Sequence, residues 1–553
     1  MRIPLAVNLE SRDGTLDQDA LVKNGIIERK GDGISVRKRP GVANLGATID
    51  ADNVTQFLVY WPDRAKLLAM KDDLLYEIST SAWTSSNIPI TTGNGPGGVS
   101  TDDAQCSVAI PPAVPTTTVS MIFASLDGAW FYSWNGSVYA AGEATGYDPA
   151  YTSSHYAVPG MVSMDGYLFG MTDKGYIFNS TLNDFKTTSS IDYVQANKEP
   201  SAGKALAKSQ NYIVALKEWS TTLYYNAGNP TGSVLSPVGN GFYQIGCANG
   251  WSVATIGDVV IWVSKSRAEG LGVHMMNGSQ PVKVSTKDID RVLALDDLAT
   301  VYAYALEFEG HKLYVLTLTD TAITLVYDIG EQAWTQWTRL TAAANKNVTS
   351  ITRSGTTATV TVSGGHGMSD GDPVTIAGAD QAGYNILAQI AYVSSTVFTI
   401  EVDSGTVSPA TGTITATPYT ESYFPYTHYC NFNGRHLVMH LTSGTISELV
   451  SSTYKDESIP INFFARTARL DGGTTEPKKL SRIGVIGDKV SDTAMIRWSD
   501  DDSTNFTKYR RVTLSNATPE LRRCGAFERR SIEFRHIGNT APSIDALELD
   551  IGR

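Results

Sequence analysis

Short apolar runs, each ended by a turn of glycine, asparagine or aspartate, recur along most of this 553-residue sequence. The clearest unit is Trp251–Ser285, which holds four such runs in about 35 residues. The runs are separated by the turns Gly257-Asp258 and Asn277-Gly278 and by a glycine-containing connection at 269–272. Turns of this composition favour antiparallel strand connections. Four short strands in this length are typical of one β-propeller blade.

Looser copies of this unit occupy most of the chain. In each copy an apolar strand follows a turn, and a later strand ends in an aromatic residue. A single copy would leave hydrophobic faces uncovered, whereas several copies around an axis cover one another and leave few strand edges exposed. We therefore predict an all-β fold containing a β-propeller of six or seven blades. The copies lie at about 54–78, 119–139, 160–178, 210–226, 251–285, 301–337 and 431–449.

Changes of pattern divide the chain further. Residues 347–418 are rich in Thr, Ser, Val and Gly and alternate with period two, which predicts a small inserted immunoglobulin-like or barrel β domain. We expect an N-terminal arm with a hairpin over 1–45 and the first part of the propeller over 46–346. The propeller is completed over 419–454, and strands with alternating residues over 455–553 predict a C-terminal β-sandwich-like region.

The composition narrows the possible functions. A formal net charge of −12 and a pI near 5.2 argue against a general nucleic-acid binder. The four cysteines are scattered without a CxxC pair, so buried free thiols are favoured over a zinc site or a disulfide framework. The apolar run at the N-terminus is too short for a signal peptide, and no stretch approaches the roughly 18 apolar residues of a membrane helix.

Candidate chemistry is sparse. Ser499–Phe506 resembles the Asp-box turn of sialidase-type propellers, which stabilises the fold rather than forming an active site. A calcium site at Asp500–Asp502 is the weaker alternative, because the EF-hand spacing is missing. His436 and His440 share a strand face without a third metal ligand. We therefore predict no catalytic, cofactor-binding or metal-binding residues and a protein that is not an enzyme.

Basic residues gather in two places. Seven arginines against three glutamates lie between Arg510 and Arg535, and a second group flanks the N-terminal hairpin. Arginine suits both polar protein interfaces and phosphate, so for the group at 510–535 we predict contacts to a neighbouring subunit, with DNA-facing positions as the alternative. For the group on the hairpin a solvated face is favoured, with a contact to a partner subunit or to DNA phosphate as the alternative. The candidate residues are Arg37, Lys38, Arg39, Arg510, Arg511, Arg522, Arg523, Arg529 and Arg530.

The order of several motifs resembles the packaged-DNA stabilisation proteins of short-tailed bacteriophages. The similarity covers most of the chain outside 347–417, and the inserted segment itself resembles small β modules of phage structural proteins. The motifs are NLESRD from Asn8, RKRPG from Arg37, TLYYNAGN from Thr222, IGCANGWSV from Ile245, GHKLYVL from Gly310 and RWSDD from Arg497.

This resemblance implies a structural virion protein, assembled in the host cytoplasm. It implies a ring, usually a homohexamer, that forms the tail hub or nozzle below the portal and adaptor and helps to retain packaged DNA until ejection. Expected partners are the adaptor and portal proteins, a tail needle, and fibre or tailspike proteins, with double-stranded DNA passing transiently and no cofactor. The alternative is a carbohydrate-binding or carbohydrate-active propeller that acts on host surface glycans.

Overall fold

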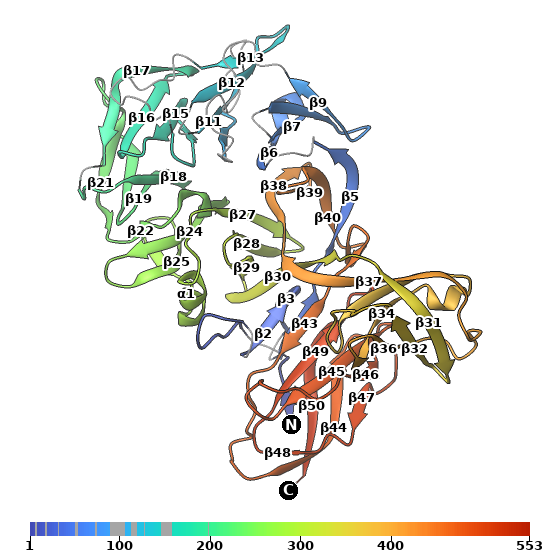
Figure 1. The fold of residues 1–553 in the computed structure, drawn as a ribbon. Coiled ribbons are helices and arrows are strands. Elements are labelled where there is room, and N and C mark those ends of the chain that lie inside the picture. The colour runs from blue at the N-terminus through green and yellow to red at the C-terminus, as the bar shows by residue number, and fades with distance from the viewer. Residues whose placement is uncertain are drawn as a thin grey trace. The chain divides into compact units, whose positions relative to one another are not determined.

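The computed structural model describes residues 1–5, 8–16, 19–30, 33–49, 54–71, 74–88, 105–111, 119–125, 128–144, 157–196 and 198–552. Nearly all regular structure in this part of the chain is β-strand, with one short α-helix, α1 (Lys287–Leu293). None of its helices has the length and hydropathy needed to cross a membrane. The chain divides into two compact units, and Figure 1 shows their strands.

The propeller unit comprises residues 43–332 and 425–449. Five of its sheets, and a run of three strands that belongs to a larger sheet, are built from strands that follow one another in the sequence, which confirms the predicted β-propeller. The strands are β6 (Thr55–Trp61), β7 (Lys66–Lys71), β8 (Leu74–Ser79) and β9 (Thr84–Ile88); β10 (Ser107–Ala109), β11 (Val119–Ala124), β12 (Ala129–Trp134) and β13 (Tyr139–Glu143); β14 (Val162–Met164), β15 (Tyr167–Met171), β16 (Tyr176–Thr181) and β17 (Asp184–Gln195); β18 (Gly203–Ser209), β19 (Tyr212–Lys217), β20 (Thr221–Asn226) and β21 (Leu235–Tyr243); β22 (Gly246–Cys247), β23 (Ala254–Ile256), β24 (Val259–Ser266), β25 (Gly270–Asn277) and β26 (Pro281–Lys283); and β27 (Val301–Phe308), β28 (His311–Leu318) and β29 (Ile323–Asp328).

A further sheet of this unit combines strands from distant parts of the sequence. In it, β5 (Gly41–Thr48) lies beside β40 (Thr445–Val450), which continues through β39 (Arg435–His440) to β38 (Tyr426–Phe432). The apolar residues of β5 pack with this sheet and with the first consecutive sheet, because Ala47 shares a buried cluster with Leu67 and Leu437.

The central strands of the blades are buried because neighbouring sheets cover both of their faces. Ile213 and Leu216 of β19 show the principle, since Ile213 packs toward the sheet of β15 and Leu216 toward the sheet of β24. A continuous apolar run can therefore lie in an antiparallel strand without exposing either face. In the blade from which the sequence pattern was defined, the buried Trp262 indole donates to the carbonyl of Gly246 at 3.0 Å.

The sandwich unit comprises residues 1–42, 333–424 and 450–553. Its two sheets share one buried cluster, to which Val36 and Leu547 contribute from the first sheet and Phe463 and Ile496 from the second. The first sheet has β3 (Gly25–Lys30), β4 (Gly33–Lys38), β50 (Ser543–Gly552), β44 (Lys478–Gly487) and β47 (Glu520–Arg522), with β1 (Arg2–Ile3) on β50 and β48 (Ala526–Phe527) on β44; the second has β30 (Ala333–Ala342), β2 (Leu21–Lys23), β43 (Phe463–Arg466), β49 (Ser531–His536), β45 (Thr493–Ser499) and β46 (Arg510–Thr513).

The N-terminal hairpin is an integral part of this sandwich. Strands β3 and β4 pair from Gly25↔Lys38 to Lys30↔Gly33, as the alternating pattern predicts. The hairpin then pairs with the last strand of the chain, because Val36 of β4 lies opposite Ile544 of β50. The first and last segments of the sequence thus form one sheet.

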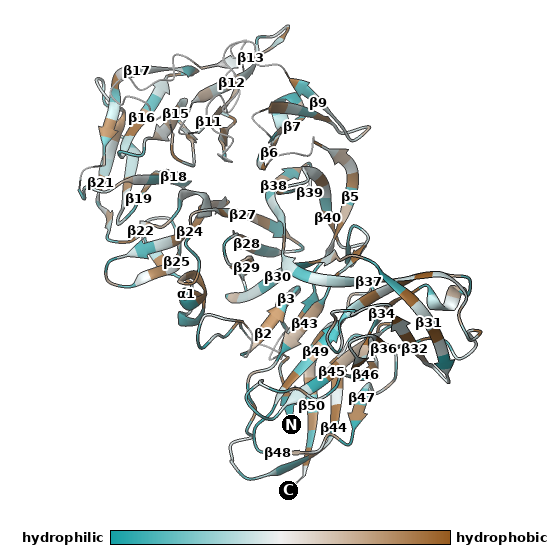
Figure 2. Cartoon of the chain, viewed as in Figure 1, coloured by the Kyte–Doolittle hydropathy of each residue, from teal (hydrophilic) through white to brown (hydrophobic). Residues whose placement is uncertain are grey.

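The inserted segment has a buried core of its own, which includes Ile351, Val360 and Phe398. It contacts the second sheet of the sandwich, since Arg535 Nη1 donates to the carbonyl of Gly371 at 2.8 Å. Figure 2 shows hydrophobic residues distributed along strands of both units and of this insertion, as expected for several separate cores. The strands are β31 (Lys346–Ser354), β32 (Thr357–Val362), β33 (Pro373–Ala379), β34 (Leu387–Gln389), β35 (Ala391–Ser394), β36 (Val397–Glu401) and β37 (Gly412–Tyr423).

Candidate interaction surfaces

Arg39, a predicted interface residue, is an internal structural cation. Its side chain and that of Asp456 are fully buried, and its Nη1 and Nη2 donate to the two carboxylate oxygens at 2.9 and 2.6 Å. Nη2 also donates to the carbonyl of Thr338 at 3.0 Å, and the guanidinium lies over the rings of Trp337 and Phe424. This residue is not exposed to a partner, because the fold itself supplies acceptors around its guanidinium.

Lys38 and Arg530 also point into the sandwich unit, so the expected surface role is wrong for them as well. The Lys38 ammonium donates to the carbonyl of Gly538 at 2.7 Å, and its burial lowers the pKa to about 7 against the opposing effect of Asp492. Arg530 forms two hydrogen bonds with Asp500, at 2.6 and 2.8 Å, and its side chain is 2% exposed. Period-two alternation did not reveal that these cations lie on covered faces.

The other six candidate residues lie nearer the surface. Arg510 brings three of them together, because its guanidinium donates to the carbonyls of Arg522 and Arg523 at 2.7 and 3.3 Å. The Arg522 side chain is 78% exposed and also contacts Glu520. We call Arg510, Arg522 and Arg523 the exposed arginine group. Arg37, Arg511 and Arg529 lie apart from it and pair with Glu28, Glu401 and Asp502.

The acidic turn at 499–506 is held by the protein's own groups. Asp500 pairs with Arg530, and the Asp501 carboxylate accepts hydrogen bonds from the backbone and side chain of Asn505 at 2.8 and 2.6 Å. These bonds lower the pKa of Asp501 to about 2. Asp502 lies within 3.1 Å of Arg469. Each carboxylate therefore has a protein partner, which matches the stabilising turn favoured over a calcium site.

Charge is divided unequally between the two units. The propeller unit holds 29 acidic and 16 basic residues, a net charge of −13, whereas the sandwich unit holds 27 acidic and 28 basic residues, a net charge of +1. The excess negative charge of the chain thus belongs to the propeller. The exposed arginine group belongs to the sandwich unit.

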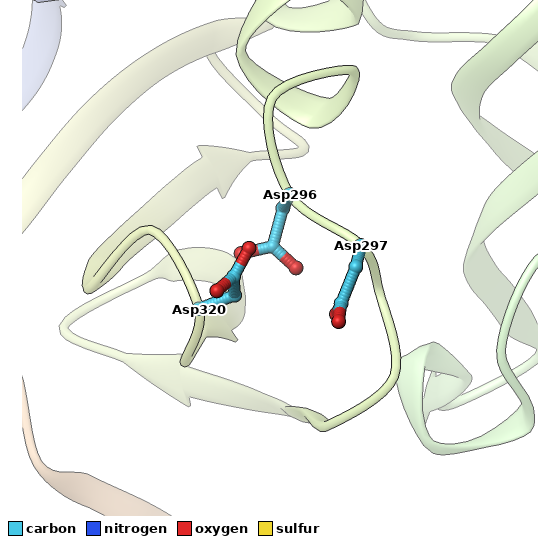
Figure 3. Close-up of side chains that lie close together, drawn as sticks. All are labelled: Asp296, Asp297 and Asp320. Atoms are coloured by element: carbon cyan, nitrogen blue, oxygen red, sulfur yellow. The ribbon is translucent and has the colours of Figure 1, made fainter.

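Three aspartates of the propeller unit form a cluster that the sequence analysis missed. Figure 3 shows Asp296 and Asp297 on the loop after α1 and Asp320 on the turn between β28 and β29. One carboxylate oxygen from each lies within 4.8 Å of the others. Asp296 accepts hydrogen bonds from the backbone and hydroxyl of Thr321, both at 2.9 Å, so this carboxylate already joins the two loops. Its members come from separate loops, which no local motif could reveal.

His436 and His440 do not converge on a common ligand position in the propeller unit. His436 Nδ1 lies 3.0 Å from the Tyr429 hydroxyl, while His440 Nδ1 accepts from the backbone of Ser443 at 3.2 Å. All four cysteines are buried free thiols, as predicted.

Two cavities lie among the described residues of the propeller unit. The first has a volume of about 550 Å³ and is lined by residues from β10, β14 and β18 and from the segment around β23, among them Ser107, Val162, Lys208 and Thr255. The second has a volume of about 700 Å³ and lies at the β14–β15 and β18–β19 turns. Its lining residues are Met164, Asp165, Gln210, Asn211, Tyr212, Tyr225, Asn226, Pro237, Val238 and Gly239.

The fold defines a β-propeller protein, and the family comparison agrees. Residues 116–358 match the family model Phage_stabilise, described as bacteriophage P22 Gp10, beta-propeller. This match confirms the resemblance predicted from the motifs. It supports the interpretation of the chain as a phage structural protein.

Other comparisons found only distant similarity. No curated protein sequence matches the chain. A computationally designed protein, Ika8, is 9% identical with a TM-score of 0.35, and the alignment covers 74% of this chain and 99% of that one. The extracellular domain of the putative one-component system BT4673 from B. thetaiotaomicron is 9% identical with a TM-score of 0.36, over 85% of this chain and 47% of that one.

Proposed function

We propose that this protein forms a ring in a phage tail, the tail hub or nozzle, which continues the DNA channel below the portal and adaptor. The ring helps to retain packaged DNA until ejection. The observation that carries the proposal is the match of the propeller to the P22 Gp10 family model. The tail position, the sixfold ring and the contact with DNA are inferences from the family resemblance.

The division of charge supports separate roles for the two units. A propeller with a net charge of −13 repels DNA phosphates, so DNA can slide past it without being held. The exposed arginine group offers guanidinium donors to acidic or carbonyl groups of a neighbouring subunit. We therefore assign the arginines to subunit contacts and the acidic propeller to the DNA-repelling surface.

Ring formation can be tested with the purified full-length protein and with its complex with the portal and adaptor of the same phage. Electron microscopy and light scattering after size-exclusion chromatography should show a closed ring with an axial channel. The double variant Arg522→Glu/Arg523→Glu should reduce ring formation at least tenfold without changing the melting temperature. A matched control is Lys174→Glu/Lys312→Glu, which changes the net charge equally on the propeller unit and should leave the ring intact.

Two outcomes would contradict the proposal. The ring assignment fails if the protein stays monomeric both alone and with the portal and adaptor. The assignment of the arginines fails if the protein binds double-stranded DNA with a steep salt dependence that Arg522→Glu/Arg523→Glu removes, because that behaviour indicates phosphate contacts.

A further inference from the structure

The second propeller cavity has the size and position of a ligand-binding site. Its volume of about 700 Å³ lies within the range of about 300–1,000 Å³ that is usual for small-molecule pockets. Two neighbouring sheets form it, through the turn between β14 and β15 in one and the β18–β19 turn with β20 and β21 in the other (Figure 1). Most of the lining residues lie at the ends of paired strands and on the turns that join them.

A carboxylate and an amide in this cavity hold each other in place. Asn226 Nδ2 donates to Asp165 Oδ2 at 2.9 Å, and Asn226 Oδ1 accepts from the backbone of Gly228 at 3.0 Å. The pair keeps one carboxylate oxygen of Asp165 and the second amide hydrogen of Asn226 for a ligand. An acceptor beside a donor is the arrangement that binds two adjacent hydroxyl groups, because each hydroxyl both donates and accepts.

Two further amides extend this polar surface. Gln210 and Asn211 are exposed at the β18–β19 turn, and neither side chain forms a hydrogen bond within the described part of the chain. Each offers both a carbonyl acceptor and an NH₂ donor. The cavity therefore presents several neutral hydrogen-bonding groups and a single charged side chain, Asp165.

Two tyrosines supply flat apolar surfaces next to these polar groups. Tyr225 is 43% exposed, although it follows four buried residues of β20, and Tyr212 is half-buried at the start of β19. An exposed aromatic ring in a concave polar site provides contact area for an apolar ligand face at low entropic cost. A sugar ring has such a face of C–H groups and a rim of hydroxyls.

We propose that this cavity binds a neutral oligosaccharide, with Tyr225 against a sugar face and with Asp165 and Asn226 on adjacent hydroxyls. Acidic glycans are disfavoured because Asp165 is the only charged side chain in the lining and the propeller unit carries a net charge of −13. The inference goes beyond the ring proposal and does not depend on it, since the cavity lies within one chain.

The test uses the full-length protein and a printed array of neutral and acidic bacterial oligosaccharides. Binding to a set of neutral oligosaccharides is expected, followed by titration of the strongest by isothermal calorimetry. Tyr225→Ala and Asn211→Ala should each weaken that binding at least tenfold. The matched control is Tyr193→Ala, which removes a tyrosine of similar exposure (37%) from β17 outside the cavity and should leave binding unchanged.

Three results would overturn the proposal. One is the absence of binding both on the array and in saturation-transfer NMR with the same neutral oligosaccharides at millimolar concentration. Another is binding that is equal in the wild type and in Tyr225→Ala, or that is confined to acidic glycans. The third is burial of the cavity by a neighbouring subunit in the assembled tail, which would assign it to a protein contact. The Tyr225→Ala variant should still form rings. Ring formation by the wild-type protein without saccharide binding would therefore contradict the saccharide proposal and leave the ring proposal intact.

Discussion

The two units bury lysine in the same way but arginine in different ways. In the propeller unit, the buried ammonium of Lys217 donates to the carbonyls of Ala196 and Glu199 at 2.7 and 2.6 Å, as that of Lys38 does to Gly538 in the sandwich unit. In the sandwich unit, the buried Arg39 pairs with a carboxylate that is itself fully buried. Arginine–carboxylate pairs do occur in the propeller among the described residues, but each of their arginines is at least 37% exposed.

The difference follows from how each unit is assembled from the sequence. Most propeller blades are made of consecutive strands, and neighbouring blades cover their apolar faces. The sandwich unit is made of three separate segments. Arg39 contacts all three, since it comes from the first and binds Thr338 in the second and Asp456 in the third. We interpret the ion pair of Arg39 and Asp456 as an interaction that specifies which distant segments of the sequence pack together.

Loss of the Arg39 guanidinium should have the largest effect on stability. Arg39→Met leaves the buried Asp456 carboxylate without its cation, which should lower the free energy of unfolding of the sandwich unit by about 4 kcal/mol. Urea denaturation followed by hydrogen exchange of each unit would measure this change. The control Arg39→Met/Asp456→Leu removes both charges and should recover at least half of the loss; no recovery would show that packing, not charge pairing, dominates there.

Acid should destabilise both units over the same pH range, because each unit buries a histidine whose pKa is lowered to about 4. Burial lowers the pKa of His428 to about 4, so between pH 6.5 and 4 the unfolded chain binds a proton that the folded chain does not. The propeller should lose about 3 kcal/mol of stability by pH 4. In the sandwich unit, burial likewise lowers the pKa of His536 to about 4, so this unit should lose a similar amount of stability over the same pH range.

This acid effect can be followed by hydrogen exchange of each unit across the same pH range. His428→Gln should reduce the pH dependence of the propeller and leave that of the sandwich unchanged. If His428→Gln left the pH dependence of the propeller unchanged, the assignment of the effect to His428 would be wrong.

A small cavity in a blade should lower the stability of the propeller by less than the changes above, and this loss should not depend on salt. Ile213 is fully buried between two blades, and Ile213→Val should lower the stability of the propeller by about 1 kcal/mol at both low and high salt. Ile191→Val is the matched control, because Ile191 is 65% exposed, and it should change nothing measurable. A salt-dependent effect of Ile213→Val would contradict the interpretation that apolar packing, rather than charge pairing, stabilises the blades.

The smallest effect is expected at the surface pair of Arg511 and Glu401. These side chains are 30% and 44% exposed and join the inserted segment to β46. Arg511→Ala should lower the free energy of unfolding by about 0.5 kcal/mol at low salt and by less at high salt, because solvent and salt screen exposed ion pairs. A cost similar to that of Arg39→Met would show that the insertion depends on this pair for docking.

The strands and turns of the blades could be predicted from sequence, because alternation and turn residues are local signals. The unit at 251–285 is an example, in which β24 and β26 lie within the predicted runs, while β25 begins inside the predicted connection at 269–272. The pairing of β5 with β40 could not be predicted, since no local signal links segments so far apart. The burial of Arg39, Lys38 and Arg530 was missed for the same reason, because alternation defines the faces of a strand but not what covers them.

The saccharide cavity illustrates the same limit. The turn residues Asp165 and Asn211 could be recognised in the sequence as parts of hairpins, but Asp165 and Asn226 meet only through the packing of two blades. A side chain that serves a turn and a side chain that serves a ligand look alike in a single sequence. Only their convergence in space distinguishes them.

The 417-residue separation between Arg39 and Asp456 has a consequence for synthesis. The first segment leaves the ribosome long before its partners exist, and β5 likewise waits for β40. Intervening blades can form as they emerge, because their strands are neighbours in the sequence. Neither unit can be completed until residues after 424 have been made, so an interrupted translation product exposes unpaired strand edges and an unpaired arginine to the quality-control machinery of the host.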